Sequence, residues 1–348
     1  MHSIYQWIWV SGAVLMLIMS GGPLIWAGDA VPPSSTTSSS QCRAIQQETD
    51  RLRCYDTAVG QPTDPKKEVP LDVVKLPDPP PTPLAELWEL EPDTKHKLFS
   101  IRPYKQVYLL PVRYTTNVNN QPSSPTEGTV PKSLGYINTE VKFQLSAKMK
   151  MLEGLFKDHL DVWIGYTQLS FFQMYSKSIS SPFRETNYEP EIIFTIHTDY
   201  DVFGLRGRFV NLGIVHQSNG RQDPLSRSWN RIYAQFGFER DGFALLVRPW
   251  YRIKEDWSAD NNPDIVQFLG HGDVVAVYKW GGHTFSLLLR SNLDFWNLHG
   301  AAQIDWSFPL YRQLKGYVQV FTGYGESLID YNHSQTTIGA GFLLLNWM

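Results

Sequence analysis

Residues 140–151 read EVKFQLSAKMKM, which is the clearest indication of secondary structure in the chain. Every even-numbered position in it is polar and every odd-numbered position is apolar. Because successive side chains of a β-strand point to opposite faces, the pattern predicts a strand with one polar and one apolar face. Twelve residues is long for a strand of a soluble protein, which averages about 5–6, and suits a strand that crosses a membrane at a tilt.

Similar segments continue to the end of the chain. We predict strands near residues 104–116, 138–152, 161–175, 189–202, 205–219, 226–239, 242–254, 264–280, 283–297, 300–312, 315–325 and 335–348. Their number is even, and Tyr, Trp and Phe gather near their ends, as the interfaces of a membrane barrel require. The sequence therefore predicts an all-β fold, a twelve-stranded antiparallel transmembrane β-barrel over residues 99–348. A soluble β-sandwich is the alternative, which strand length and aromatic content disfavour.

The chain before the barrel has a different composition. Residues Trp7–Trp26 are mostly apolar and small residues follow them, which predicts a secretory signal peptide over residues 1–30. An uncleaved membrane anchor is the alternative. Residues 31–98 are rich in proline, serine and threonine, so we expect a largely extended segment outside the barrel, in the periplasm.

Both cysteines of the chain, Cys42 and Cys54, lie in a stretch of helical composition within that segment. In an exported protein such a pair suggests a disulfide. A straight helix would hold the two Cα atoms about 18 Å apart, whereas a disulfide tolerates about 7 Å. Pairing therefore requires the chain to fold back between the cysteines, and the sequence leaves open whether it does.

Charge and hydropathy narrow the possible partners. The formal net charge is −3 and no basic stripe is present, which disfavours binding to nucleic acid. After the N-terminal apolar run, no segment reaches the ~18 apolar residues of a membrane-spanning helix. The remaining chain is therefore either soluble or crosses a membrane by strands.

One predicted hairpin carries polar residues on its apolar face. In the segment 205–219, His216 and Ser218 share the parity of the apolar residues, and Asn230 does so in the segment 226–239. We expect all three on the lipid-facing side, where an isolated polar group is unfavourable. Residues two apart on a strand have Cα atoms about 6.6–6.8 Å apart, so the three could act as nucleophile, base and orienting residue. The alternative is that they simply lie at the level of the lipid headgroups.

The segment HQSNGRQDPLSRSWNR, residues 216–231, resembles the active-site segment of the outer membrane phospholipase A family. Further matches are SSPFRETNYEPE at 180–191, NPDI at 262–265 and YGESLIDYN at 324–332, and the resemblance covers roughly residues 100–348. It implies a calcium-dependent hydrolase of the bacterial outer membrane that cleaves acyl esters of phospholipids and lysophospholipids at either acyl position (A1 and A2).

The resemblance also assigns roles to residues. By it, Ser218 is the nucleophile, His216 is the general base and Asn230 orients the imidazole. The oxyanion would be bound by the backbone N–H groups of Ser218 and Gly220, assisted by calcium-bound water.

Calcium and dimerisation are linked in the family. The matching calcium ligands are the carbonyl of Arg221 and Ser226 from one subunit and Ser180 from the other, so the active form is expected to be a homodimer. Gln168 matches a polar interface residue, and its parity independently places it on the predicted lipid face, although a glutamine at headgroup level is the alternative. A non-enzymatic barrel, either a pore or a scaffold with a polar dimerisation patch, remains the alternative to the enzyme.

Overall fold

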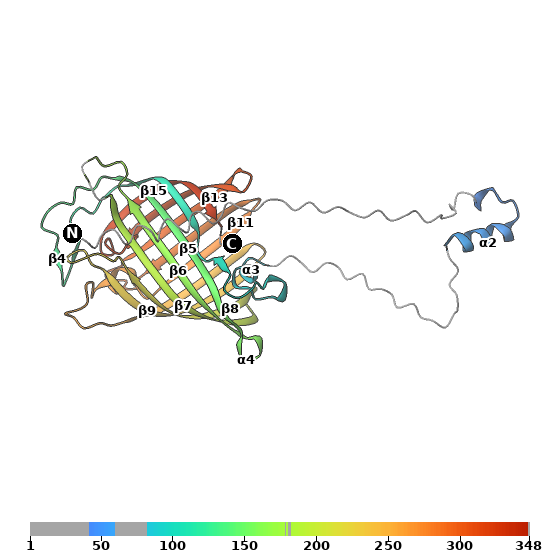
Figure 1. Ribbon diagram of the computed structural model, residues 1–348, viewed down its shortest axis with the longest axis horizontal. Coiled ribbons are helices and arrows are strands. Elements are labelled where there is room, and N and C mark those ends of the chain that lie inside the picture. Colours follow the sequence, from blue (N-terminus) through green and yellow to red (C-terminus); the bar gives the residue numbers. More distant parts are fainter. Residues whose placement is uncertain (1–41, 60–81, 178, 180–181, 347–348) are drawn as a thin grey trace. The chain divides into compact units, whose positions relative to one another are not determined.

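The computed structural model describes residues 42–59, 82–177, 179 and 182–346 (Figure 1). The chain divides into two compact units, Met1–Pro77 and Asp78–Met348. The predicted signal peptide lies outside the described residues.

The first unit contains a short helical segment that a disulfide closes. The 3-10 helix η1 (Cys42–Ala44) is followed by α2 (Glu48–Val59), and Cys42 and Cys54 form a disulfide with their Cα atoms 5.5 Å apart. The chain folds back between η1 and α2, so the separation imposed by a straight helix does not apply. The structure therefore contains the pairing that the sequence left open.

The described residues of the second unit form a closed antiparallel barrel of twelve long strands (Figure 1). In chain order these are β2 (Val107–Thr115), β5 (Thr139–Gly154), β6 (Leu160–Phe172), β7 (Phe183–Val202), β8 (Leu205–Ser218), β9 (Ser228–Arg240), β10 (Phe243–Ile253), β11 (Gly272–Trp280), β12 (His283–Ser291), β13 (Gly300–Tyr311), β14 (Leu314–Tyr324) and β15 (Ser334–Leu345). Consecutive strands pair, and β2 closes the barrel by pairing with β15 and β5. The predicted fold is confirmed.

The other described elements are short. They are β1 (Ile101–Pro103), which pairs antiparallel with β5, the small pair β3 (Ser123–Ser124) and β4 (Gly128–Thr129), and the helical segments α3 (Pro83–Trp88), η2 (Pro92–Thr94), α4 (Leu155–Asp158) and α5 (Ile265–Leu269). α5 occupies the start of the range 264–280, for which the sequence predicted one strand. Its Ile265 and Leu269 are buried in a cluster with Trp250 inside the barrel, a packing that the apolar run alone did not reveal.

The two ends of the barrel differ in their connections. Short connections form the turn end, at residues 155–159, 203–204, 241–242, 281–282 and 312–313. Longer connections form the loop end, at residues 116–138, 173–182, 219–227, 254–271, 292–299 and 325–333. Outer-membrane barrels have short periplasmic turns and longer extracellular loops. Among the described residues, no helix is long and apolar enough to cross a membrane.

The alternation in residues 140–151 separates a polar lumen from an apolar outer face. Lys142 is buried inside, with Nζ 2.8 Å from Oε1 of Glu326, whereas Leu145 is 40% exposed outside. Burial opposes the ionisation of Glu326, but Arg113 and Lys142 outweigh it and hold the pKa of Glu326 at about 2. Buried charges remain ionised when they are paired in this way. The polar side chains of residues 140–151 can therefore be accommodated in the lumen.

The segment that begins at Thr82 and contains α3 belongs to the barrel unit. Thr82 caps α3 by accepting a hydrogen bond from the Ala85 N–H, and Pro83 occupies a first-turn position where its missing N–H leaves nothing unsatisfied. The helix lies at the turn end (Figure 1), where the N–H of Leu84 donates to Glu239 at 3.1 Å.

Burial of α3 corrects the expectation that residues 31–98 lie outside the barrel. Trp88 is 1% exposed and packs in one cluster with Trp163 and Phe209 of the barrel strands. Among the described residues, the chain therefore packs with the barrel from α3 onward. The proline content indicated an extended chain, whereas the short sequence PLAELW forms a capped helix that buries its apolar side chains in the barrel.

Candidate active site on the outer face of the barrel

Two neighbouring strands bring His216, Ser218 and Asn230 together at the loop end. In the register of β8 and β9, His216 lies directly opposite Asn230. Along β8, Leu212 is exposed on the outer face and Val215 is buried on the inner face, and His216 continues the exposed parity. The three side chains therefore lie on the lipid-facing side, as their parity predicts.

The histidine ring is held by the asparagine amide. Nδ1 of His216 lies 2.8 Å from Oδ1 of Asn230, and Nδ2 of Asn230 donates to Oε1 of Glu255 at 2.8 Å. A neutral imidazole whose Nδ1 donates to an amide oxygen carries its proton there, which leaves Nε2 as an acceptor. Glu255 was not predicted from the sequence, because it lies in the loop 254–271, and strand alternation does not place a loop residue beside β9.

Ser218 lies on the same face as His216, two residues further along β8 and opposite Ser228 of β9. Its side chain is half-buried. The structure describes no hydrogen bond between the His216 ring and the Ser218 hydroxyl. Such bonds are often long in the absence of substrate and shorten in the reacting complex, so the arrangement is compatible with a nucleophile and its base.

The loop 219–227 is braced by Asn219. Its Oδ1 accepts a hydrogen bond from the N–H of Arg227 at 3.0 Å, and its Nδ2 donates to the Leu225 carbonyl at 2.8 Å. The next residue, Gly220, has φ +59°, a left-handed conformation that favours glycine. In the described part of the chain nothing accepts a hydrogen bond from its N–H, so this donor is available beside Ser218.

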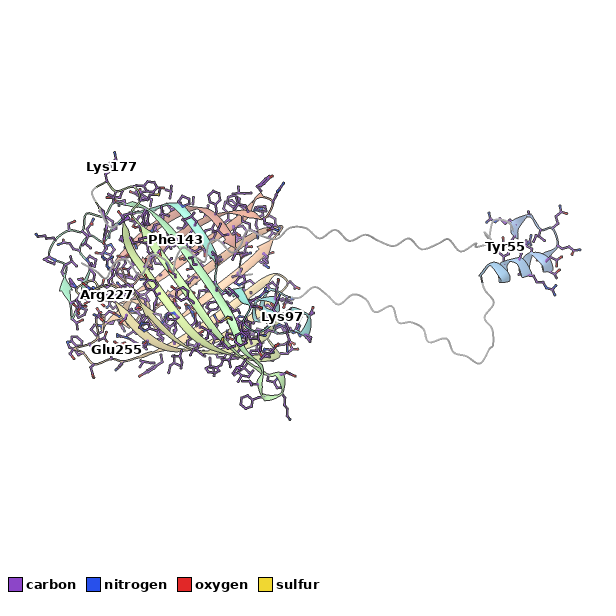
Figure 2. All side chains as sticks on the ribbon, viewed as in Figure 1. Tyr55, Lys97, Phe143, Lys177, Arg227 and Glu255 are labelled. Atoms are coloured by element: carbon purple, nitrogen blue, oxygen red, sulfur yellow. A yellow bond between two sulfur atoms is a disulfide. The ribbon has the colours of Figure 1, made fainter. Side chains whose placement is uncertain are left out.

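Arg227 fixes the far side of the same loop. Its guanidinium donates to the carbonyls of Pro224 and Ser226 at 3.1 and 2.6 Å, and it lies 5.9 Å from the Tyr331 ring centroid. Burial lowers the pKa of Arg227 from its ordinary value. Figure 2 labels Arg227 and Glu255 at the same end of the barrel, so both neighbours of the site belong to the loop end.

Comparison with known proteins identifies the family. The family model described as phospholipase A1 matches residues 84–344. The chain belongs to the phospholipase A1 family. A putative phospholipase A1 of Neisseria meningitidis serogroup B is 42% identical over 269 residues, which cover 75% of this chain and 70% of the relative. Phospholipase A1 of Klebsiella pneumoniae is 37% identical over 71% of this chain and 82% of that protein.

Solved structures of the phospholipase A1 family share the barrel. Outer membrane phospholipase A from Escherichia coli matches with a TM-score of 0.64 and 35% identity, covering 71% of this chain and 95% of that chain. A Salmonella typhi outer membrane phospholipase, solved as a dimer with bound calcium, matches with a TM-score of 0.67 and 35% identity, covering 77% and 98%. The protein is thus a phospholipase of the bacterial outer membrane, as the resemblance implied.

The expected calcium ligands of this phospholipase are only partly described. Ser180 lies outside the described residues. The Arg221 carbonyl and the Ser226 hydroxyl have no hydrogen-bond partner among the residues that the structure describes, so both oxygens are available. Calcium takes hydroxyl and carbonyl oxygens as ligands, and the chemistry of these donors fits the ion.

Gln168 lies on β6 in a small polar network. Its Nε2 donates to Ser170 Oγ at 3.2 Å, and its Oε1 accepts a hydrogen bond from the Tyr166 hydroxyl at 3.1 Å. Tyr166 is exposed on the outer face. A partly exposed glutamine in a hydrogen-bonded network can extend that network to a second polar surface, so it remains a candidate for an interface.

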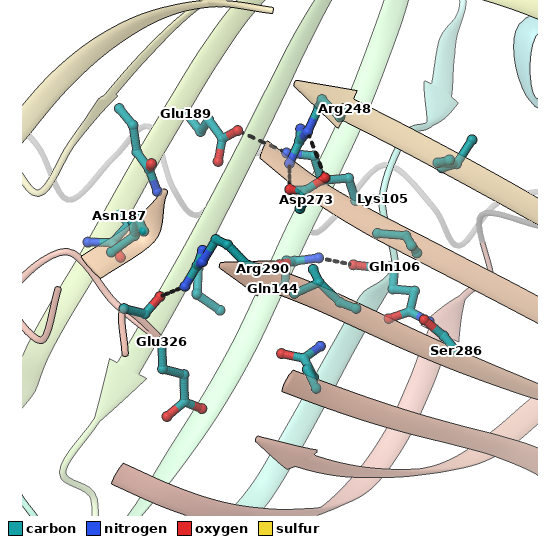
Figure 3. A pocket seen from close by; sticks show the side chains of 18 of the residues that line it. Lys105, Gln106, Gln144, Asn187, Glu189, Arg248, Asp273, Ser286, Arg290 and Glu326 are labelled. Atoms are coloured by element: carbon teal, nitrogen blue, oxygen red, sulfur yellow. Dashed lines mark hydrogen bonds and ion pairs between the residues drawn. The ribbon is translucent and has the colours of Figure 1, made fainter. Parts of the chain in front are cut away.

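The lumen of the barrel holds a cavity of about 250 Å³ that is separate from this site (Figure 3). Gln217 and Trp229 line the cavity, and they alternate in sequence with the site residues, which point to the other face. Several of the charged side chains in the cavity form ion pairs, as in the 2.6 Å contact between Arg248 and Asp273. With the buried Trp88 of α3 also lining it, the interior is largely filled, which disfavours the pore alternative.

Proposed function

We propose that this phospholipase hydrolyses acyl esters through Ser218, His216 and Asn230 on its lipid-facing surface, with A1 and A2 specificity and dependence on calcium. The proposal rests on the 2.8 Å contact between His216 and Asn230 on the outer face, two residues along β8 from Ser218. A polar pair with a neighbouring hydroxyl has no structural need to face hydrocarbon, whereas an enzyme for membrane lipids requires a site there.

The proposed reaction has two steps: the acyl group is transferred to Ser218 and then to water. Nε2 of His216 takes the proton of Ser218 as the hydroxyl oxygen attacks the ester carbonyl, and the ring then gives that proton to the departing lysolipid oxygen. Water repeats the sequence on the acyl-serine and releases the fatty acid. The N–H groups of Ser218 and Gly220 stabilise the oxyanion in both steps.

The surroundings of the site suit a lipid substrate. Leu212 and Ile214 on β8 and Ile232 on β9 are exposed on the same face, with about half of each side chain accessible. An acyl chain lying along this surface would place its ester at the level of Ser218. A lysophospholipid presents the same ester and chain, so the proposal includes it as a substrate.

Calcium and a second copy of the chain complete the proposed site. Arg221 and Ser226 of one copy and Ser180 of another would hold the ion, and Gln168 would lie between the copies. When bound, calcium supplies positive charge near the oxyanion. Because these ligands carry no formal charge, affinity within one copy is weak, and by linkage calcium must promote pairing. The family relative solved as a dimer with bound calcium supports this part of the proposal.

A Ser218→Ala variant tests the function. Purified protein would be assayed for fatty-acid release from phospholipid with calcium or with a chelator. We expect hydrolysis to be nearly abolished in Ser218→Ala, and retained in the matched control Ser228→Ala, which alters the serine directly opposite on β9. Turnover by Ser218→Ala at the wild-type rate would show that another residue is the nucleophile.

A further inference from the structure

We propose that Glu255 is a positioning residue for the hydrolysis, because its carboxylate holds the Asn230 amide in the one orientation that leaves His216 able to act as a base. The inference rests on the proposed function of His216 and Asn230. It adds a third residue to their chain of hydrogen bonds.

The three side chains form a row across adjacent strands. His216 of β8 lies opposite Asn230 of β9, and Asn230 lies opposite Ile253, the last residue of β10. Glu255 follows two residues after Ile253, at the start of the loop 254–271. Figure 2 labels Glu255 at the loop end of the barrel, and its carboxylate reaches Asn230 at 2.8 Å.

The chemistry of a carboxylate fixes the direction of each hydrogen bond in this row. An ionised carboxylate only accepts hydrogen bonds, so the NH₂ group of Asn230 must face Glu255. The amide oxygen then faces His216, and Nδ1 of the ring must donate to it across 2.8 Å. Nε2 is left without a proton, which is the state that can take the proton of Ser218.

The opposite orientation of the amide would inactivate the ring. Its oxygen would face the oxygen of Glu255, two acceptors without a hydrogen between them. Its NH₂ group would face Nδ1 of His216, which would then accept, and the ring proton would move to Nε2. A ring in that tautomer has no lone pair to offer Ser218. Glu255 therefore selects against the inactive tautomer.

The Glu255 carboxylate can act on Asn230 without competition from a neighbouring cation in the described part of the chain. Within the described residues no cation forms an ion pair with it, whereas Glu326 in the barrel is paired with Lys142. The uncompensated charge also explains an asparagine at position 230. An aspartate there would place two carboxylates in hydrogen-bond contact, and such a pair does not remain doubly ionised.

Charge-neutral and truncated variants measure the contribution of Glu255. We expect Glu255→Ala and Glu255→Gln to lower kcat by roughly tenfold to a hundredfold, the range given by loss of one charge-assisted hydrogen bond. KM should stay within about twofold, because Glu255 positions the base and does not contact the substrate. The matched control is Asp256→Asn, which removes the adjacent charge and should retain activity. Wild-type kcat in both Glu255 variants would overturn the inference.

A double substitution gives a readout that a merely structural role would not produce. We expect Asn230→Asp to be poorly active, and Asn230→Asp with Glu255→Gln to be more active than Asn230→Asp alone. In the double variant the NH₂ group of the amide introduced at position 255 can donate to the new carboxylate at position 230, whose other oxygen accepts from His216. A double variant no more active than the single one would contradict the inference, since without coupling the two losses add.

The ring tautomer separates this inference from the proposed function. Nitrogen-15 NMR of the His216 ring, assigned with His216→Ala, should show the proton on Nδ1 in the wild type and a mixture of tautomers in Glu255→Ala. An unchanged tautomer in Glu255→Ala would refute the positioning role even if Ser218 is the nucleophile. Conversely, full activity of Ser218→Ala would refute the proposed nucleophile while leaving the tautomer result intact.

Discussion

Replacing Gly220 with alanine tests whether the loop after β8 holds an N–H group for the reaction. Gly220 has φ +59°, a conformation that carries a penalty of about 1–2 kcal/mol for a residue with a Cβ. The added Cβ would lie 3.3 Å from Cε2 of Tyr188, so the ring or the loop must shift by a few tenths of an ångström. Both effects move the Gly220 N–H away from its position beside Ser218.

The expected effect on rate is larger than the effect on folding. Loss of one oxyanion donor lowers kcat by about 10²–10³, and because a shifted loop retains part of the interaction, we expect a loss of at least about tenfold. The assay is the initial rate of fatty-acid release from phospholipid in mixed micelles with saturating calcium. Gly128→Ala is the control, because Gly128 has φ +69° and no atom of the described residues lies within 4 Å of its added Cβ. Wild-type activity in Gly220→Ala, or an equal loss in Gly128→Ala, would refute the reasoning.

Three further expectations concern stability and assembly. Trp88→Ala should lower the free energy of unfolding by about 3–5 kcal/mol, measured by denaturant titration in detergent, since it empties a buried site in the barrel. In sedimentation experiments calcium should raise the dimer fraction of the wild type, and Gln168→Leu or Ser180→Ala should weaken that response; a monomer fully active with calcium would contradict it. The pKa of Glu326 is about 2 in the fold against an ordinary 4.5, so its ionisation stabilises the barrel above pH 4.5 and this stabilisation is lost as the pH falls toward 2. Glu326→Gln should therefore show a flatter loss of stability over that range, and a slope equal to that of the wild type would contradict the assignment.

The barrel could be predicted from the sequence because each residue of a membrane strand faces either lipid or the lumen, and its polarity matches that side. Lipid on one side and a polar lumen on the other force the strict alternation seen in residues 140–151. The same alternation placed His216 and Asn230 outside, and the register of β8 and β9 then brought them into contact. The alternation predicts which face each side chain occupies, because a shift of the strand register by one residue would turn every side chain to the wrong face.

Features that depend on contacts between distant segments were not predictable in this way. α3 lies in a proline-rich stretch and is stabilised by burial of Trp88 against the barrel, which no local pattern reports. α5 has the apolar composition of a strand, and its packing with Trp250 decides otherwise. Glu255 lies in the loop just beyond the strand predicted at 242–254, so its contact with Asn230 emerged only from the structure.

The assignment of Ser218 as a nucleophile activated by His216 is tested by the site at which the protein reacts with an alkyl sulfonyl fluoride, a reagent for activated serine hydroxyls. Mass spectrometry of the wild-type protein with calcium should show one adduct per chain, located on Ser218, and the adduct should be absent from His216→Ala because the hydroxyl is no longer activated. An adduct on a different residue, or modification of Ser218 at the same rate in His216→Ala, would contradict a serine nucleophile activated by His216 on the lipid-facing surface.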